Sequence, residues 1–159
     1  GGVEGGVRKA GRPGGGKPGG GLGGGRRSWR PGGRWVAGVG GHGNVATSIA
    51  AVEAAGVDHG RGASTFQGYC PTADAYADRV RQHGFQVQLM ETAPRPTALP
   101  TGVAGWLRVF AAPLLDDLPA AARATVREAA VVLLEDLPRD AAGQPLADYV
   151  RLRVLARRR

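Results

Sequence analysis

A histidine and an asparagine beside a glycine-rich turn are the first side chains in this sequence that could do chemistry. Residues 38–43 match G-x-G-x-x-G after an apolar run, and Asn44 follows them. In dinucleotide-binding proteins this pattern holds a pyrophosphate at the start of a helix. Such a unit needs a second apolar strand that ends in an acid, and only Val57 precedes Asp58. We therefore favour a plain strand-to-helix connection, with His42 and Asn44 lining a pocket, over a cofactor loop.

Tyr69, Arg95 and Trp106 are the other candidates for lining a substrate pocket. Arg95 stands between two prolines and could hold a carboxylate through two parallel hydrogen bonds, or be a surface arginine. Tyr69 and Trp106 could equally be packing aromatics with one hydrogen-bonded polar atom, and His42 a solvated loop histidine. No catalytic residue is assigned, because no serine stands in a nucleophile-elbow motif.

Periodicity predicts the elements around the glycine turn. Residues 34–39 form a short apolar strand. Residues 44–55 follow as an amphipathic helix, which Asn44 caps and Gly56 ends. Its apolar face is expected to contain Val45, Ile49 and Val52.

The rest of the chain alternates helices and strands. Residues 73–83 are predicted to form a helix capped by Thr72, and residues 85–90 alternate as a strand. Prolines predict a rigid loop over residues 93–102. A short apolar helix begins at Gly105.

A longer helix is predicted over residues 118–137, and residues 148–156 alternate as a closing strand. Asp117 caps this helix, Pro119 sits in its first turn and Pro138 stops it. Its buried stripe is expected to contain Leu118, Ala122, Val126, Ala129, Leu133 and Leu137.

Composition separates a leader from the part that can fold. Of the 28 glycines, 20 fall in residues 1–43, and residues 1–34 hold eight Lys/Arg against one acid. Residues 1–29 cannot bury enough apolar surface to offset the entropy of ordering, so we expect a disordered Gly/Arg-rich leader. The alternatives are a basic arm that contacts RNA and a stretch translated in the wrong frame. The remainder, residues 30–159, is close to neutral and forms at most one domain.

Single residues exclude further classes. Cys70 is the only cysteine, so the chain has no internal disulfide and no cysteine-based zinc site, and no metal is expected. The longest apolar run, residues 129–134, is far too short to span a bilayer. We expect a cytoplasmic protein without a membrane partner.

Several motifs, in order, resemble one enzyme family. The segment Arg30-Pro31-Gly32-Gly33-Arg34-Trp35-Val36 is similar to the turn and fifth strand of class I S-adenosylmethionine (SAM) dependent methyltransferases. The helix at 73–83, followed by Gly84-Phe85 and a strand, is similar to the family's next segment. Residues 94–97, 105–108 and 147–153 resemble the end of a small-molecule subgroup related to trans-aconitate methyltransferases, which has a helical insert before the last strand.

The resemblance implies an α/β fold, namely the C-terminal part of a Rossmann-like seven-stranded sheet. Residues 34–39, 85–90 and 148–156 would be strands five, six and seven, with the seventh antiparallel. No residue of this chain matches the family's SAM-binding motifs, so no cofactor-binding residue is assigned. The implied function is methylation of a small molecule with SAM as cofactor, in a fragment that lacks the SAM-binding half and is inactive alone.

Two further consequences concern partners. A sheet cut before strand five leaves an open edge, through which the chain could self-associate. The alternative function is a non-enzymatic RNA-binding protein that uses the basic Gly/Arg-rich arm. The resemblance implies a small-molecule methyl acceptor as the partner. The nearly neutral charge of the foldable part argues against nucleic acid as a partner.

Overall fold

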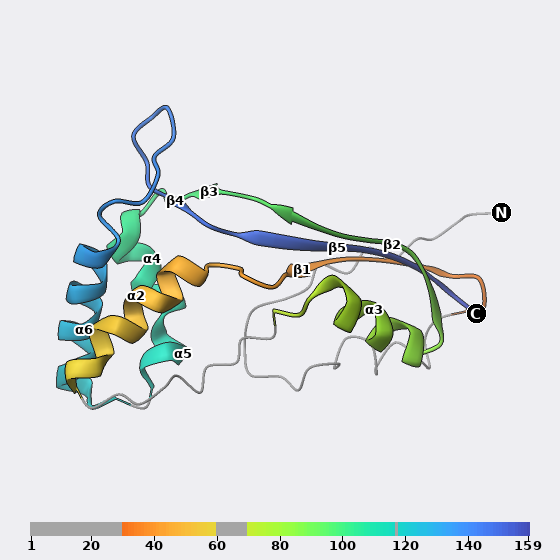
Figure 1. The fold of residues 1–159 in the computed structure, drawn as a ribbon, viewed down its shortest axis with the longest axis horizontal. Helices are drawn as coiled ribbons and strands as arrows, with labels where there is room; N and C mark the ends of the chain where they lie inside the picture. The colour runs from red at the N-terminus through yellow and green to blue at the C-terminus, as the bar shows by residue number, and fades with distance from the viewer. Residues whose placement is uncertain (1–29, 60–69, 117) are drawn as a thin grey trace. The chain divides into compact units, whose positions relative to one another are not determined.

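The computed structural model describes residues 30–59, 70–116 and 118–159 (Figure 1). They form a mixed α/β structure of two compact units. The sheet unit consists of residues 30–44, 70–94 and 150–159. The helical unit consists of residues 45–59, 95–116 and 118–149. The sequence predicted a single domain over residues 30–159 and did not predict this division into two units.

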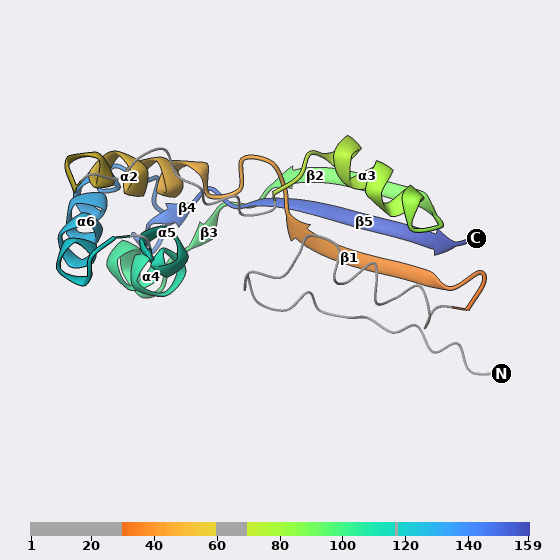
Figure 2. The same ribbon diagram turned by 90° about the horizontal axis from the view of Figure 1, so that it is seen from below.

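Three strands make the sheet: β1 (Arg34–Gly40), β2 (Phe85–Pro94) and β5 (Val150–Arg158). β5 lies between the other two and is antiparallel to both, as Figure 2 shows. β1 and β2 therefore run in the same direction with one reversed strand between them. All three strands were predicted from alternating or apolar runs, and β2 extends four residues further than predicted.

One face of the sheet is covered by α3 (Ala73–Gln82) (Figure 1). The amide of Ala75 donates to Thr72 Oγ1 at 3.3 Å, which confirms the predicted cap. Gly84, with φ of +80°, turns the chain from the helix into β2 in a conformation that favours glycine. The buried core under α3 consists of Tyr76, Val80, Phe85, Leu152, Val154 and Ala156.

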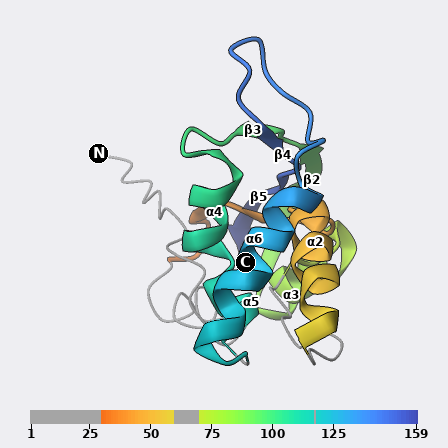
Figure 3. The same ribbon diagram turned by 90° about the vertical axis from the view of Figure 1, so that its left-hand side faces the viewer.

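The helical unit contains α2 (Ala46–Gly56), α4 (Gly102–Phe110), α5 (Ala112–Leu115) and α6 (Ala120–Leu133). A short 3₁₀ turn, η2 (Val57–His59), extends α2. α6 lies between α2 and α4 (Figure 3). Val52 of α2 is buried in their shared core, with Val45 and Ile49 packed against it, as the periodicity predicted. Leu107, Leu115, Val126 and Ala130 are fully or almost fully buried there.

A small second ladder replaces part of the predicted proline loop. Pro94 ends β2, and β3 (Thr97–Ala98) pairs antiparallel with β4 (Leu146–Ala147). The amide of Leu99 continues this pairing by donating to Pro145 O at 2.9 Å. The prolines do not prevent the pairing, because the residues between and after them keep their amide groups.

The predicted cap of α2 is wrong. The helix begins at Ala46, after Val45 in a left-handed conformation with φ of 51°. The side chain of Asn44 is used elsewhere, because its Oδ1 accepts from the amide of Val150 at 2.9 Å. The first turn of α2 is instead satisfied by a carboxylate far along the chain, described below.

The predicted long helix is also corrected. α6 begins after Pro119 and ends at Leu133, five residues before Pro138. The core side chains are Val126, Ala130 and Leu134, spaced by four residues, whereas Leu133 is 56% exposed. Ala122 packs beside this core as predicted, Ala129 is half-buried, and Leu118 and Leu137 are buried but lie outside the helix.

Three predictions lie outside the described residues: the disordered leader at 1–29, the pocket role of Tyr69 and the cap at Asp117. Within the described ranges, no helix is long and apolar enough to cross a membrane.

Candidate functional site

The glycine turn after β1 is held by hydrogen bonds within the sheet unit. The amide of Gly41 donates to Val150 O at 2.9 Å, and that of His42 donates to Pro71 O at 3.0 Å. The amide of Asn44 donates to Gly41 O at 3.0 Å. A phosphate-binding turn needs amides that point at the ligand. These three amides already have partners in the protein, so the turn does not offer them to a pyrophosphate.

Close packing explains one glycine of the turn. A Cβ on Gly41 would lie 3.2 Å from Val150 Cγ1, which is tighter than ordinary contact. Gly41 stands at a variable position of G-x-G-x-x-G. Of the pattern's own glycines, Gly40 is required by packing, because a Cβ there would lie 3.1 Å from Asn44 Nδ2, and Gly43 adopts a φ of +80°, which favours glycine. Packing and turn geometry therefore account for these two glycines without a cofactor.

Asn44 connects three parts of the sheet unit. Its Oδ1 accepts from Val150 at the start of β5, and its side chain hydrogen-bonds the thiol of Cys70. Burial raises the pKa of the Cys70 thiol, and the hydrogen bond to Asn44 partly opposes that rise. A thiol held protonated is a weak nucleophile. Asn44 and Cys70 therefore have a structural arrangement, and the side chain of His42 is exposed beside them.

Arg95 and Trp106 both lie close to Tyr149 in the helical unit. The amide of Arg95 donates to Tyr149 O at 2.7 Å, and Arg95 itself is exposed. Trp106 is 8% exposed, and its Nε1 donates to the Tyr149 hydroxyl at 2.8 Å. Trp106 is thus a packing aromatic with its polar atom satisfied, the alternative that the sequence left open. The exposed guanidinium of Arg95 remains available to a ligand.

A pocket of about 370 Å³ in the helical unit was not predicted from the sequence. The C-terminal end of α6 and the segment after it supply most of its apolar wall. Its lining residues are Thr47, Pro96, Leu133, Leu134, Asp136, Leu137, Pro138, Leu146, Ala147 and Asp148. Leu133, exposed at the surface, belongs to this wall.

Asp148 is the polar group that distinguishes this pocket. Its Oδ2 accepts from the amide of Thr47 at 3.0 Å and from the Thr47 hydroxyl at 2.9 Å. The carboxylate thereby satisfies an amide in the first turn of α2, where a negative charge is also favoured. Its Oδ1 is buried and has no hydrogen-bond partner among the described residues. Buried carboxylate oxygens are normally hydrogen-bonded, so this oxygen is suited to a donor from a ligand.

The sequence contains a weak signal for Asp148. It is the single acid between the apolar pair Leu146-Ala147 and the alternating run of β5. The alternating pattern places Asp148 in the closing strand, whereas β5 begins at Val150. Its partner Thr47 lies 101 positions away, beyond the reach of a local pattern. Across the described part of the chain, no group of three or more His, Cys, Asp or Glu side chains could hold a metal ion.

Comparison with protein-family models and with curated proteins finds no match to this chain.

Proposed function

We propose that residues 30–159 are the C-terminal, substrate-side part of a class I SAM-dependent methyltransferase that acts on a small molecule. The observation that carries the proposal is the strand order, in which β5 lies between β1 and β2 and is antiparallel to both. The sequence resemblance implies parallel strands five and six and an antiparallel seventh strand inserted beside the sixth, and β1, β2 and β5 fit this description. Strands that are neighbours in sequence usually pair directly through short connections, whereas this order needs a long connection between β2 and β5. Local strand propensity alone does not produce such an order, so its fit to the resemblance supports the proposal.

The segment between β2 and β5 supports the same proposal. It contributes three helices, α4, α5 and α6, to the helical unit. The subgroup that the sequence resembles has a helical insert at this place. The same segment supplies most of the pocket beside Asp148.

The pocket suggests the chemical class of the methyl acceptor. Its apolar wall fits an apolar body, and the unpartnered Oδ1 of Asp148 would accept a hydrogen bond from a hydroxyl or amine. The exposed Arg95 would favour an acceptor that also carries a negative charge. In such enzymes the protein contributes mainly by orienting the acceptor.

The described residues do not fit SAM itself. The amides of the glycine turn donate within the protein, and residues 34–39 contain no acid ahead of that turn. We therefore propose that this chain neither binds SAM nor methylates by itself.

Calorimetric titration of SAM into the full chain, beside a variant that lacks residues 1–30, tests this proposal. We expect no binding heat from samples whose circular dichroism shows folded protein. Saturating heat at micromolar SAM would mean that the glycine turn binds the cofactor and that β1 is not the fifth strand.

Analytical ultracentrifugation gives a second test. Among the described strands, β1 pairs on one side only, with β5. If β1 normally continues into a larger sheet, its free edge should promote self-association. We expect concentration-dependent oligomers, and a monodisperse monomer would contradict the truncated-sheet proposal.

A further inference from the structure

The near-neutral foldable part of the chain separates its charges between the two units. Among the described residues, the sheet unit holds nine arginines and three acids. The helical unit holds five arginines and eight acids. The net charge of the whole foldable part does not reveal this separation, because segments that follow one another in the sequence belong to different units.

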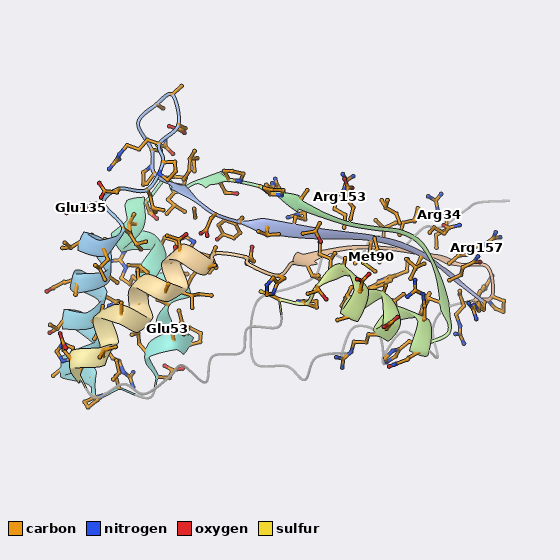
Figure 4. The ribbon with its side chains drawn as sticks, in the orientation of Figure 1. Arg34, Glu53, Met90, Glu135, Arg153 and Arg157 are labelled. Atoms are coloured by element: carbon orange, nitrogen blue, oxygen red, sulfur yellow. The ribbon has the colours of Figure 1, made fainter. Side chains whose placement is uncertain are left out.

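Four of the nine arginines of the sheet unit gather on one face of the sheet. Along β5, Leu152, Val154 and Ala156 are buried toward α3, so the residues that alternate with them point to the opposite face. We call the outward set Arg34, Arg151, Arg153 and Arg157 the arginine face; all four are exposed. In Figure 4, three of these (Arg34, Arg153 and Arg157) project from the side of the sheet away from α3.

The arginine face carries uncompensated charge. Arg34 of β1 lies directly opposite Arg157 of β5 in the strand register, and like charges in such a position destabilise a sheet. Glu91 reaches Arg153 at 3.5 Å, whereas no described acid forms an ion pair with Arg34 or Arg157. These two arginines, with Gly32 and Gln88, line a pocket of about 360 Å³. Opposed guanidinium groups around a hollow form a site for phosphate oxygens.

We propose that the arginine face binds the phosphate backbone of single-stranded RNA. On the outward face of β5, Arg151 and Arg153 are two residues apart, about 6.6–6.8 Å along the strand, and Arg157 lies four residues beyond Arg153, with Leu155 between them. A row of arginines along one strand suits a chain of phosphates. Val36 and Leu89, 48% and 42% exposed, lie on the same face and offer apolar contact to bases. No described aromatic lies on this face, so base stacking does not contribute and the binding is independent of sequence. The strip is narrow and follows the twist of the sheet, which fits a strand better than a flat membrane.

This inference does not depend on the methyltransferase proposal. It also differs from RNA binding by the Gly/Arg-rich arm, because it places the contacts on β1 and β5. The experiment must therefore keep the arm and change only the arginine face.

Fluorescence anisotropy of a labelled oligouridylate with the full chain, over a series of salt concentrations, tests the proposal. The test variant is Arg34→Gln/Arg157→Gln. The matched control is Arg108→Gln/Arg127→Gln, which removes the same charge from the helical unit. Each lost phosphate contact lowers the slope of log affinity against log salt by about 1. We expect the test variant to lose about 2 from that slope and the control to keep the slope of the unmodified chain.

Two additional samples separate the proposal from unfolding and from general charge. Arg34→Lys/Arg157→Lys keeps the charge and should keep the slope. The test variant should unfold at a temperature close to that of the unmodified chain, because the removal of a like-charge pair offsets the loss of the hydrogen bond from Arg157 Nε to Gly32 O at 3.1 Å. Equal slope losses in the test and control variants would overturn the proposal, as would a slope loss in the lysine variant. Binding to phosphatidylserine vesicles without binding to the oligouridylate would also overturn it, in favour of a membrane partner.

Discussion

The indole nitrogen of Trp106 donates a hydrogen bond to the hydroxyl of Tyr149 at 2.8 Å, and the two rings meet edge to face. Trp106 lies in α4 and Tyr149 directly precedes β5. The contact therefore holds α4 to a segment 43 positions away in the sequence. It also explains why a large aromatic with a polar atom can be almost fully buried here.

Replacing Tyr149 with Phe removes the acceptor and keeps the ring. Because the indole N–H then stays buried without a partner, we expect a loss of about 1–3 kcal/mol in the free energy of unfolding. Chemical denaturation of the full chain measures this loss. Trp106→Phe/Tyr149→Phe removes both polar partners and should cost less than the sum of the two single changes. Additive losses would mean that the hydrogen bond contributes nothing measurable.

Leu133 is the last residue of α6 and Leu134 is its C-terminal cap, and the two neighbours differ in solvent exposure. Leu134 is 2% exposed and Leu133 is 56% exposed. We expect Leu134→Ala to lower the free energy of unfolding by about 2–5 kcal/mol, and Leu133→Ala to change it by no more than about 0.5 kcal/mol. The two variants, compared by denaturant unfolding, are each other's control. The reverse order of losses would support the helix phase predicted from the sequence.

The Cys70 thiol should ionise at a higher pH than an exposed cysteine, because burial raises its pKa. An unperturbed cysteine thiol has a pKa of about 8.5. We expect the rate of iodoacetamide alkylation of Cys70 to rise with pH around a midpoint above that value. The folded state holds this proton more tightly than the unfolded chain. The thiol's contribution to stability is therefore complete below the unfolded pKa and is lost as the pH rises through the folded one.

Asn44→Ala removes the hydrogen bond that lowers the pKa of Cys70. The pH at the midpoint of alkylation should therefore rise further, provided that Cys70 stays buried in the variant. Cys70→Ser supplies the background rate without the thiol. A midpoint that moves toward neutral pH, in a variant that still folds, would contradict the role of Asn44.

Local patterns predicted most elements of this fold. The alternating run of β5 has Leu152 and Val154 buried, as expected from a period of two. The cap at Thr72 was recognisable because its partner is three residues away. The pairing of β3 with β4 was not, because each strand has only two residues and no periodicity.

The candidate site was predicted less well than the fold. Of the pocket candidates, Trp106 proves to be a packing aromatic, and Arg95 stands exposed next to the pocket residue Pro96. Asp148 was missed as a pocket residue. Its hydrogen bonds to Thr47 join residues 101 positions apart, and no local pattern reports such a contact.

The sequence by itself determined the strands, most helices and the resemblance to methyltransferases, because propensity, periodicity and short-range caps act within a few residues. Only the tertiary structure decided that Asp148 rather than Asn44 satisfies the start of α2, and that Arg34 lies opposite Arg157. Both depend on strand register and on which distant segments pack together. These are set by burial over the whole unit, so the same residues in sequence order do not reveal them.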